Sequence, residues 1–258
     1  MPSVVRTSGL RRRAQALGES LLEAVYPRRC ALCHTSIAGD DAPLCPACRE
    51  AVEAASRHPA CPRCGMTLAP FAGPACVTCA QRTFPFDSVV RVGAYTGGLR
   101  ALLTAFKFGG HEELDVYFAE RLARVIMRLE VYEEIDALVA VPTCWQHRLR
   151  RSFHPAAVLA RLAARRCRIP LAPLLVRRGG PHQVGLSLTA RQANVRGRFH
   201  LARGCAVPGA RLLLVDDVMT TGATAGECTR VLRRAGADAV HVAVVGRAGD
   251  DPVTLRHV

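Results

Sequence analysis

A repeat of eight cysteines constrains the first third of this chain more than any other feature. Four cysteines recur 31 residues later with the same spacing, C-x2-C-x11-C-x2-C: Cys30, Cys33, Cys45 and Cys48, then Cys61, Cys64, Cys76 and Cys79. Four thiolates in two close pairs are the ligand set of a closed, tetrahedral Zn²⁺ site. Each copy is too short to fold around a core of its own, so metal binding would supply its folding free energy. The repeat predicts two zinc ribbons, each with one structural zinc ion.

Disulfide bonds are the alternative use of these cysteines, and they need an oxidising compartment. The basic N-terminus is not followed by an apolar stretch of signal-peptide length, and the chain has no apolar run long enough to cross a membrane. We therefore expect zinc sites in a cytoplasmic protein, with a peripheral position at the inner face of the membrane as a further option. Ligand sets within each copy are the simplest arrangement, and a crossed arrangement stays open.

After the cysteines, continuous apolar runs alternate with segments of helical periodicity. The expected strands are Ser88–Ala94, Ile135–Val141, Arg211–Val215 and Ala239–Val245, and the expected helices are Leu10–Val25, Leu99–Lys107, Leu114–Leu129, Ala156–Cys167 and Ala223–Ala235. Continuous apolar strands separated by helices indicate a parallel sheet that is covered on both faces. We predict an α/β domain with a parallel sheet over residues 84–258, preceded over residues 1–83 by a helix and the double zinc ribbon.

The positive charge of the chain is concentrated in one window. The formal net charge is +14, and no Asp or Glu lies between Asp136 and Asp216. The arginines of this window equal the whole excess: Arg148, Arg150, Arg151, Arg161, Arg165, Arg166, Arg168, Arg177, Arg178, Arg191, Arg196, Arg198, Arg203 and Arg211. A localised positive field favours an anionic ligand, either a nucleic acid or a polyphosphate metabolite. The plainer alternative is a solvated surface in an arginine-rich protein.

Lys107 is the only lysine in the chain, since arginine supplies every other basic side chain. An ammonium group is a compact point charge, whereas a guanidinium group is a planar fork. A retained lysine therefore indicates a position where the compact charge is needed. The alternative is a lysine without a role on the face of a helix.

The stretch from Leu212 to Gly226, LLLVDDVMTTGATAG, carries the most specific chemistry. An apolar strand leads to Asp216 and Asp217, and a loop with Gly222 and three threonines leads into a helix. Backbone N–H groups at such a helix start form an anion-binding nest, to which hydroxyls add donors. The two carboxylates would repel the same anion, so they must face sugar hydroxyls or a bound Mg²⁺. The pattern predicts a sugar phosphate at the carboxyl edge of the sheet.

Other chemistry that uses similar residues can be weighed against this interpretation. A Walker-B strand also ends in acids, but the single lysine is followed by Phe108, so the G-x-x-x-x-G-K-[ST] motif is absent and a P-loop NTPase is excluded. A polar helix start without a ligand is the plain alternative. Four further cysteines lack paired spacing and are expected to be core or surface thiols: Cys144, Cys167, Cys205 and Cys228.

The run V-D-D-V-M-T-T-G-A-T resembles the phosphoribosyl-pyrophosphate loop of type I phosphoribosyltransferases. From Leu21 to Arg247 the chain resembles the ComF family, in which such a domain follows paired zinc ribbons. Features outside the loop that match this family are Tyr26-Pro27, Tyr95-x-Gly97, Lys107-Phe108, Val141-Pro142, Gln183, Gly185-Leu186-Ser187, Arg191, Asn194 and Phe199. The chain departs from the family at Ser152-Phe153-His154-Pro155, where Gly-Phe-Asn-Gln is usual.

The resemblance implies a type I phosphoribosyltransferase-like domain that binds phosphoribosyl pyrophosphate together with Mg²⁺. It assigns Asp216 and Asp217 to the ribose hydroxyls and to catalysis. The other implied ligand contacts are Met219, Thr220, Thr221, Gly222, Ala223, Thr224, Lys107, Arg148 and Arg151. If the domain is active, it is a glycosyltransferase that displaces pyrophosphate.

The resemblance also implies a role in natural competence, because ComF relatives are linked to the entry of single-stranded DNA into the cytosol. The implied partners are then single-stranded DNA and the competence DNA-translocation machinery. Two alternatives remain: an active phosphoribosyltransferase of nucleotide metabolism, and a regulator that binds phosphoribosyl pyrophosphate without turnover.

Overall fold

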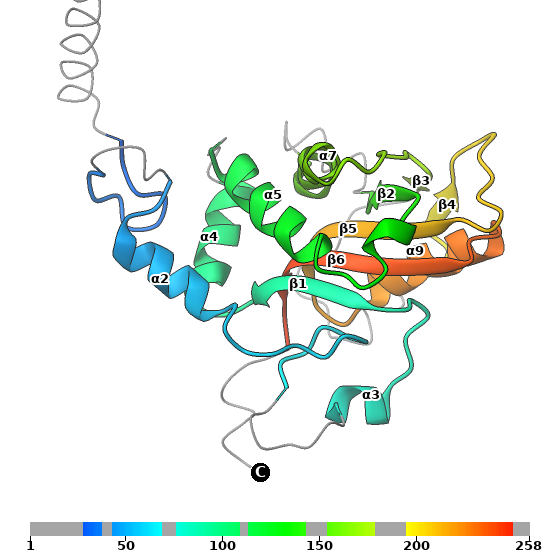
Figure 1. The fold of residues 1–258 in the computed structure, drawn as a ribbon, viewed down its shortest axis with the longest axis horizontal. Helices are drawn as coiled ribbons and strands as arrows, with labels where there is room; N and C mark the ends of the chain where they lie inside the picture. Colours follow the sequence, from blue (N-terminus) through cyan, green and yellow to red (C-terminus); the bar gives the residue numbers. More distant parts are fainter. Residues whose placement is uncertain are drawn as a thin grey trace, which may run out of the picture.

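The computed structural model describes residues 28–37, 43–68, 76–108, 113–142, 154–178 and 195–249. Its centre is a four-stranded parallel sheet in the order β1-β6-β5-β2 (Figure 1). The strands are β1 (Val89–Ala94), β2 (Ala137–Ala140), β5 (Arg211–Met219) and β6 (Ala239–Arg247). The two longest strands, β5 and β6, lie side by side in the middle, and β1 and β2 form the edges.

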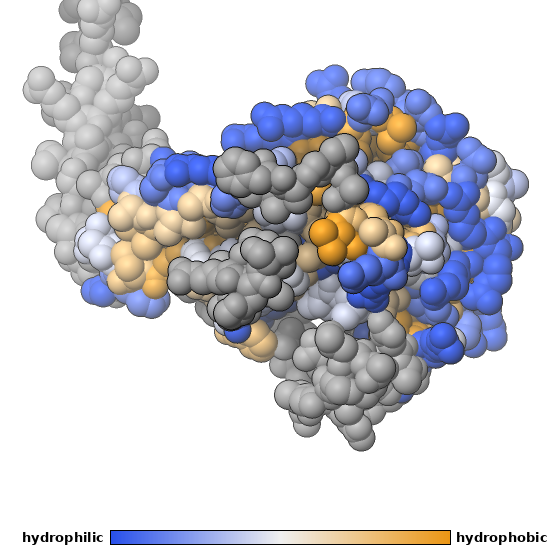
Figure 2. Space-filling model, turned by 90° about the horizontal axis from the view of Figure 1, so that it is seen from below, coloured by the Kyte–Doolittle hydropathy of each residue, from blue (hydrophilic) through white to orange (hydrophobic). Residues whose placement is uncertain are grey.

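Helices cover both faces of this sheet (Figure 1). One face carries α4 (Gly97–Phe108), α5 (Glu113–Ile126) and α7 (Pro155–Cys167), with the short helix η1 (Tyr132–Glu134) leading into β2. The other face carries α9 (Ala223–Arg234) and a two-stranded antiparallel sheet of β3 (Leu175–Arg177) and β4 (Phe199–Leu201). Seen from below, hydrophilic residues cover the side of the molecule opposite the first ribbon (Figure 2).

The apolar run of β5 shows why the sheet needs cover on both faces. Successive side chains of a strand point to opposite faces. Leu213 and Val215 belong to the core under α4, α5 and α7, whereas Leu212 and Leu214 belong to the core under α9. All four side chains are at most 1% exposed. A strand that is buried on both faces cannot alternate polar and apolar residues, which is why the parallel sheet could be predicted from continuous runs.

The two ribbons dock on opposite faces of the sheet, next to edge strand β1. The first ribbon contains α2 (Pro46–Ala54), which packs on α4, and its Cys30 belongs to the core on that face. The second ribbon contains α3 (Val77–Gln81), and its Cys61 and Cys64 belong to the core under α9. The two copies of the repeat therefore have the same cysteine spacing but pack against different parts of the core.

Both ribbons hold β1 through main-chain hydrogen bonds at its two ends. The Val89 N–H donates to the Pro62 carbonyl at 2.8 Å, and the Ala94 N–H donates to the Ala55 carbonyl at 2.9 Å. Both ribbons share a core with the sheet. The predicted boundary between the two domains, at residues 83 and 84, stays a prediction.

The elements expected from the sequence after the ribbons are all present, with shifts of a few residues at their ends. One boundary is wrong in a way that matters. The strand expected to end at Val215 continues to Met219, because pairing with β6 continues to Arg247. The expected helix Leu10–Val25 lies outside the described residues. Among the residues that are described, no helix is long and apolar enough to span a bilayer.

Candidate functional site

The candidate site lies at the carboxyl edge of the sheet, where β5 runs past its neighbour β2. The last residue of β2, Ala140, pairs with Val215, and β5 then continues through Asp216 and Asp217. Both acids therefore lie on the strand itself and not, as the sequence indicated, just after its end. Their backbone is held by the pairing with β6, so the two carboxylates have a rigid support.

Lys107 meets Asp217 at this edge. It lies in the last turn of α4, and its Nζ is 3.0 Å from Asp217 Oδ2. The two side chains are only 20% and 15% exposed, so the ion pair is shielded from most of the solvent. The other oxygen of Asp217, Oδ1, accepts a hydrogen bond from the Val218 N–H at 2.6 Å. The structure thus brings the single lysine of the chain to the two acids.

Asp216 is the more constrained of the two acids. Its Oδ1 accepts a hydrogen bond from the Asp217 N–H at 2.9 Å. Burial, and then repulsion from Asp217, raise the pKa of Asp216 well above its usual range, while Lys107 acts in the opposite direction. A carboxyl group whose pKa is shifted in this way, by burial and a charged neighbour, is a candidate for a functional site. The arrangement also has a cost in stability that a structural role does not require.

The loop from Thr220 to Thr224 joins these acids to α9. Gly222 has a φ of +76°, in the left-handed region that favours glycine, and stands at the N-cap of α9 without a side-chain cap. The Thr221 hydroxyl accepts a hydrogen bond from the Ala223 N–H at 3.3 Å. The first N–H groups of a helix need partners from outside the helix, and an anion can supply them. The loop leads into a helix at Ala223, as its sequence predicts, and anion binding by it stays a prediction.

A cavity of about 150 Å³ opens beside this loop. Its lining joins the loop residues Thr221, Gly222 and Ala223 to three arginines that are distant in the sequence: Arg82, Arg196 and Arg230. Glu227 also lines the cavity, but its carboxylate is paired with Arg230 at 2.8 Å and accepts from the Gly197 N–H at 3.0 Å. Positive charge therefore exceeds negative charge around the cavity. Arg82 and Arg230 were not singled out from the sequence, because only the folded chain brings them together.

The other residues expected at the site are Met219, two arginines that follow β2, and the stretch that departs from the family pattern. Met219 is 4% exposed and packs in the core under α9, so any ligand contact would come from its backbone. Arg148 and Arg151 lie outside the described residues. His154 starts α7: its Nδ1 accepts a hydrogen bond from the Ala157 N–H at 3.1 Å, ahead of Pro155 in the first turn. His154, one of the residues that differ from the usual family pattern, is therefore the N-cap of α7.

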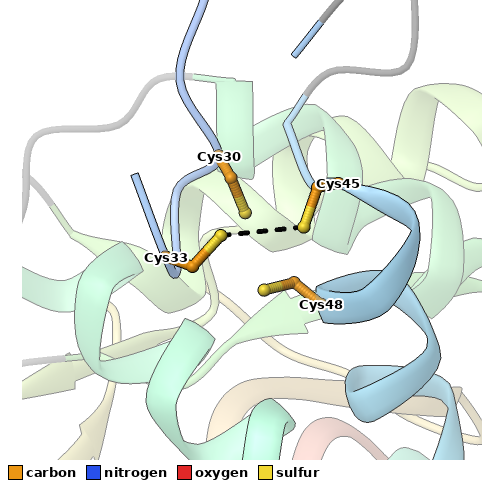
Figure 3. A group of neighbouring side chains, drawn as sticks. All are labelled: Cys30, Cys33, Cys45 and Cys48. Atoms are coloured by element: carbon orange, nitrogen blue, oxygen red, sulfur yellow. Dashed lines mark hydrogen bonds between the residues drawn. The ribbon is translucent and has the colours of Figure 1, made fainter. Parts of the chain in front are cut away.

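Each copy of the cysteine repeat forms its own group. Within each group, all four sulfur atoms lie within 4.8 Å of one another, and the first group is drawn in Figure 3. The sulfur atoms of Cys33 and Cys45 are 3.7 Å apart, and in the second group those of Cys64 and Cys76 are 3.5 Å apart. Two ligands of a tetrahedral site with Zn–S bonds of about 2.3 Å lie about 3.8 Å apart. Both groups fit zinc, with the ligand sets within each copy.

The surroundings of the two groups differ. In the first group Cys33 is exposed, and a hydrogen bond between its sulfur and the Thr35 hydroxyl (3.2 Å) lowers the pKa of Cys33 to about 6. In the second group Cys61 and Cys64 are both buried, and burial raises the pKa of Cys64. Of the unpaired cysteines, Cys167 and Cys228 are buried, Cys205 is half-buried and Cys144 lies outside the described residues.

Comparisons with known proteins agree with this architecture. Residues 21–89 match the family model of a double zinc ribbon domain. The chain is 30% identical to Competence protein F of Haemophilus influenzae, over 85% of this chain and 97% of that protein. It is 31% identical to the DNA utilization protein YhgH of Escherichia coli, over 84% of this chain and 95% of that protein. The chain belongs to the competence protein F family.

Solved structures similar to this family member include an adenine phosphoribosyltransferase from Rhodothermus marinus. The TM-score is 0.37 at 22% sequence identity, over 57% of this chain and 74% of that structure.

Proposed function

We propose that this member of the competence protein F family binds phosphoribosyl pyrophosphate with Mg²⁺ and takes part in the handling of single-stranded DNA during natural competence. One observation carries the ligand assignment. A shielded lysine, two adjoining carboxylates and a helix start with glycine at its N-cap lie at one edge of the sheet. A ligand with hydroxyls at one end and phosphates at the other uses all three.

Each part of the ligand has a chemical counterpart in this arrangement. The 5′-phosphate accepts hydrogen bonds from the N–H groups and hydroxyls of the loop from Thr220 to Thr224. Asp216 and Asp217 accept from the ribose hydroxyls. The pyrophosphate meets the positive charge of Lys107, Arg148 and Arg151. The attraction between opposite charges a few ångströms apart is strongest where water is largely excluded, as it is around Lys107.

Mg²⁺ fits the donor set of this edge. It prefers oxygen ligands and is commonly held by one or two carboxylates together with substrate phosphates. Asp216 and Asp217 supply such oxygens. Burial, and then repulsion from Asp217, raise the pKa of Asp216, and a divalent cation would relieve the repulsion. When bound, the ion would neutralise charge on the pyrophosphate leaving group.

Binding of single-stranded DNA is supported by the names of the relatives and by the distribution of arginines. The relatives are called Competence protein F and DNA utilization protein. In the described part of the arginine window, Arg177 and Arg178 lie beside Arg198 and Phe199, because β3 pairs with β4 and the Arg178 N–H donates to the Arg198 carbonyl at 2.8 Å. A row of arginines can follow a phosphate backbone without reading sequence.

A calorimetric titration with phosphoribosyl pyrophosphate and Mg²⁺ tests the ligand. The wild-type chain should bind, and the double variant Asp216→Asn, Asp217→Asn should lose affinity by about a hundredfold or more while it stays folded. The acidic residue Asp238, which pairs with Arg211 away from the loop, supplies the matched control Asp238→Asn, with unchanged affinity expected. Wild-type affinity in a folded double variant would refute the assignment. Release of pyrophosphate on adding a nucleobase would favour an active phosphoribosyltransferase, and binding without release a regulator.

A further inference from the structure

Arg247 occupies the junction between the second ribbon and the ligand loop. It is the last residue of β6 and is 2% exposed. Its Nε donates to the Cys64 carbonyl at 2.9 Å, and one terminal nitrogen donates to the Met219 carbonyl at 3.3 Å and to the Thr220 carbonyl. One guanidinium group thus joins a cysteine of the second cluster to the last residue of β5 and the first residue of the loop.

A second layer of contacts joins the same two parts. Phe84 and Phe86 stack with their ring centres 5.1 Å apart, and a Cβ atom placed on Gly222 would lie 3.5 Å from both rings. The rings therefore touch the back of the loop. Arg63, which belongs to the second ribbon, donates to the carbonyl of Phe84 at 2.6 Å and to that of Phe86. The rear of the loop rests on a surface that the second ribbon holds in place.

The first ribbon has a different connection. Its helix α2 lies against the start of α4, where a Cβ atom placed on Gly98 would lie 2.8 Å from the backbone of Ala51. Arg121 of α5 forms an ion pair with Glu53 of α2, with 3.5 Å between Nη2 and Oε1. Residues of its first knuckle also line a pocket with α4 as far along as Ala105, two residues before Lys107. The first ribbon therefore reaches the Lys107 side of the site, but it lacks the hydrogen bonds by which Arg247 and Arg63 join the second ribbon to the loop and its supporting rings.

We propose that Arg247 is a positioning residue that couples the second cysteine cluster to the ligand loop, so that zinc in the second cluster holds the loop in its binding conformation while zinc in the first does not. Loss of the metal would release the ribbon fold, and with it the Cys64 carbonyl and Arg63. The loop would then lose its support from Arg247 and from the two rings. The inference rests on the proposed function for its ligand readout only.

Two matched cysteine variants of the full chain test this coupling. Cys48→Ser and Cys79→Ser each remove the fourth ligand of one copy, and both residues are half-buried. The first readout is hydrogen exchange of the amides from Thr220 to Ala225, without any ligand. We expect exchange to rise at least tenfold in Cys79→Ser and to change less than threefold in Cys48→Ser. Phosphoribosyl pyrophosphate affinity should fall at least tenfold in Cys79→Ser only.

Arginine variants separate the positioning role from metal binding. Arg247→Met should keep two zinc ions yet show the faster loop exchange of Cys79→Ser, and Arg247→Lys should lie between it and the wild type. Arg121→Met removes the corresponding tie of the first ribbon and should leave loop exchange unchanged.

Equal loop exchange in the two cysteine variants would overturn the proposal, as would wild-type exchange in a folded Arg247→Met variant. If Arg247→Met does not fold, the cysteine pair still decides. If the wild type does not bind phosphoribosyl pyrophosphate, the proposed function fails, whereas hydrogen exchange still tests the coupling.

Discussion

At the scale of the residue, Asp216 shows how the proposed ligand site departs from the demands of folding. The residues that precede it on β5, from Leu212 to Val215, have buried apolar side chains that stabilise the sheet. A carboxylate in the same strand, beside a second carboxylate, is desolvated and repelled in the folded state. Lys107 offsets part of this cost through Asp217. A cost of this kind is what we expect of a residue with a role in binding, as proposed above.

The sign of this cost gives a prediction for the variant Asp216→Asn. Because the folded state raises the pKa of Asp216, it holds the proton more tightly than the unfolded chain, and stability is lost as pH rises from about 4 through the folded pKa. Asp216→Asn removes the charge and should increase the unfolding free energy at pH 7 by about 1 to 2 kcal/mol. Urea unfolding at pH 7 and pH 4 measures this, and the gain should vanish at pH 4. A variant that is less stable than the wild type at pH 7 would contradict the argument.

At the scale of the element, the sequence predicted what periodicity and spacing encode. The continuous run of β5 and the stripe of α5 carry enough residues for a clear pattern. β3 and β4 have three residues each, too few to show alternation, so they were missed. The end of β5 was placed too early because acids usually mark the end of a buried strand, whereas here the hydrogen bonds to β6 continue beneath them.

The ribbons give the prediction that belongs to this scale. Protein purified without added zinc should contain close to two equivalents, since both cysteine groups have tetrahedral spacing. The two ions should leave at different rates, because Cys33 of the first group is exposed whereas the second group has two buried ligands and no exposed one. We expect a chelator to remove the first ion about tenfold faster. Alkylation mapped by mass spectrometry should show Cys33 labelled first, because it is exposed and its pKa is lowered. A single equivalent, or one phase of loss with both groups labelled together, would contradict this.

At the scale of the whole molecule, the sequence could not show which face of the sheet each ribbon takes. Two copies with identical spacing read as a tandem module, yet one joins the core under α4 and the other the core under α9. The sequence also could not show that Arg82, Arg196 and Arg230 line one cavity beside the loop. Such convergence depends on strand order and helix placement, which local patterns do not encode. The acids, the loop and Lys107 could be singled out as candidates because the first two are contiguous and the third is the single lysine, and the structure places Lys107 against Asp217.

The arginine window gives the last prediction. Outside the window basic and acidic residues balance, so an anionic polymer should bind within it. Arg148, Arg150 and Arg151 are one of its two clusters of three arginines within four residues, and they are the cluster that follows the carboxyl end of β2. Changing all three to Gln should weaken binding of a single-stranded oligonucleotide and flatten its dependence on salt, by about 0.7 in log–log slope for each phosphate that the protein no longer neutralises.

The matched control for this triple variant changes three exposed arginines outside the window, Arg57, Arg124 and Arg128, to Gln. It removes the same charge, so an equal fall in DNA affinity in the two variants would mean that only net charge matters. Anisotropy titrations at several salt concentrations measure the slope, and calorimetry measures phosphoribosyl pyrophosphate affinity in the same samples. If DNA binding falls and the small ligand is unaffected, the two sites are separate. If only binding of the small ligand is abolished, the window serves its pyrophosphate and the role in DNA handling has no physical basis.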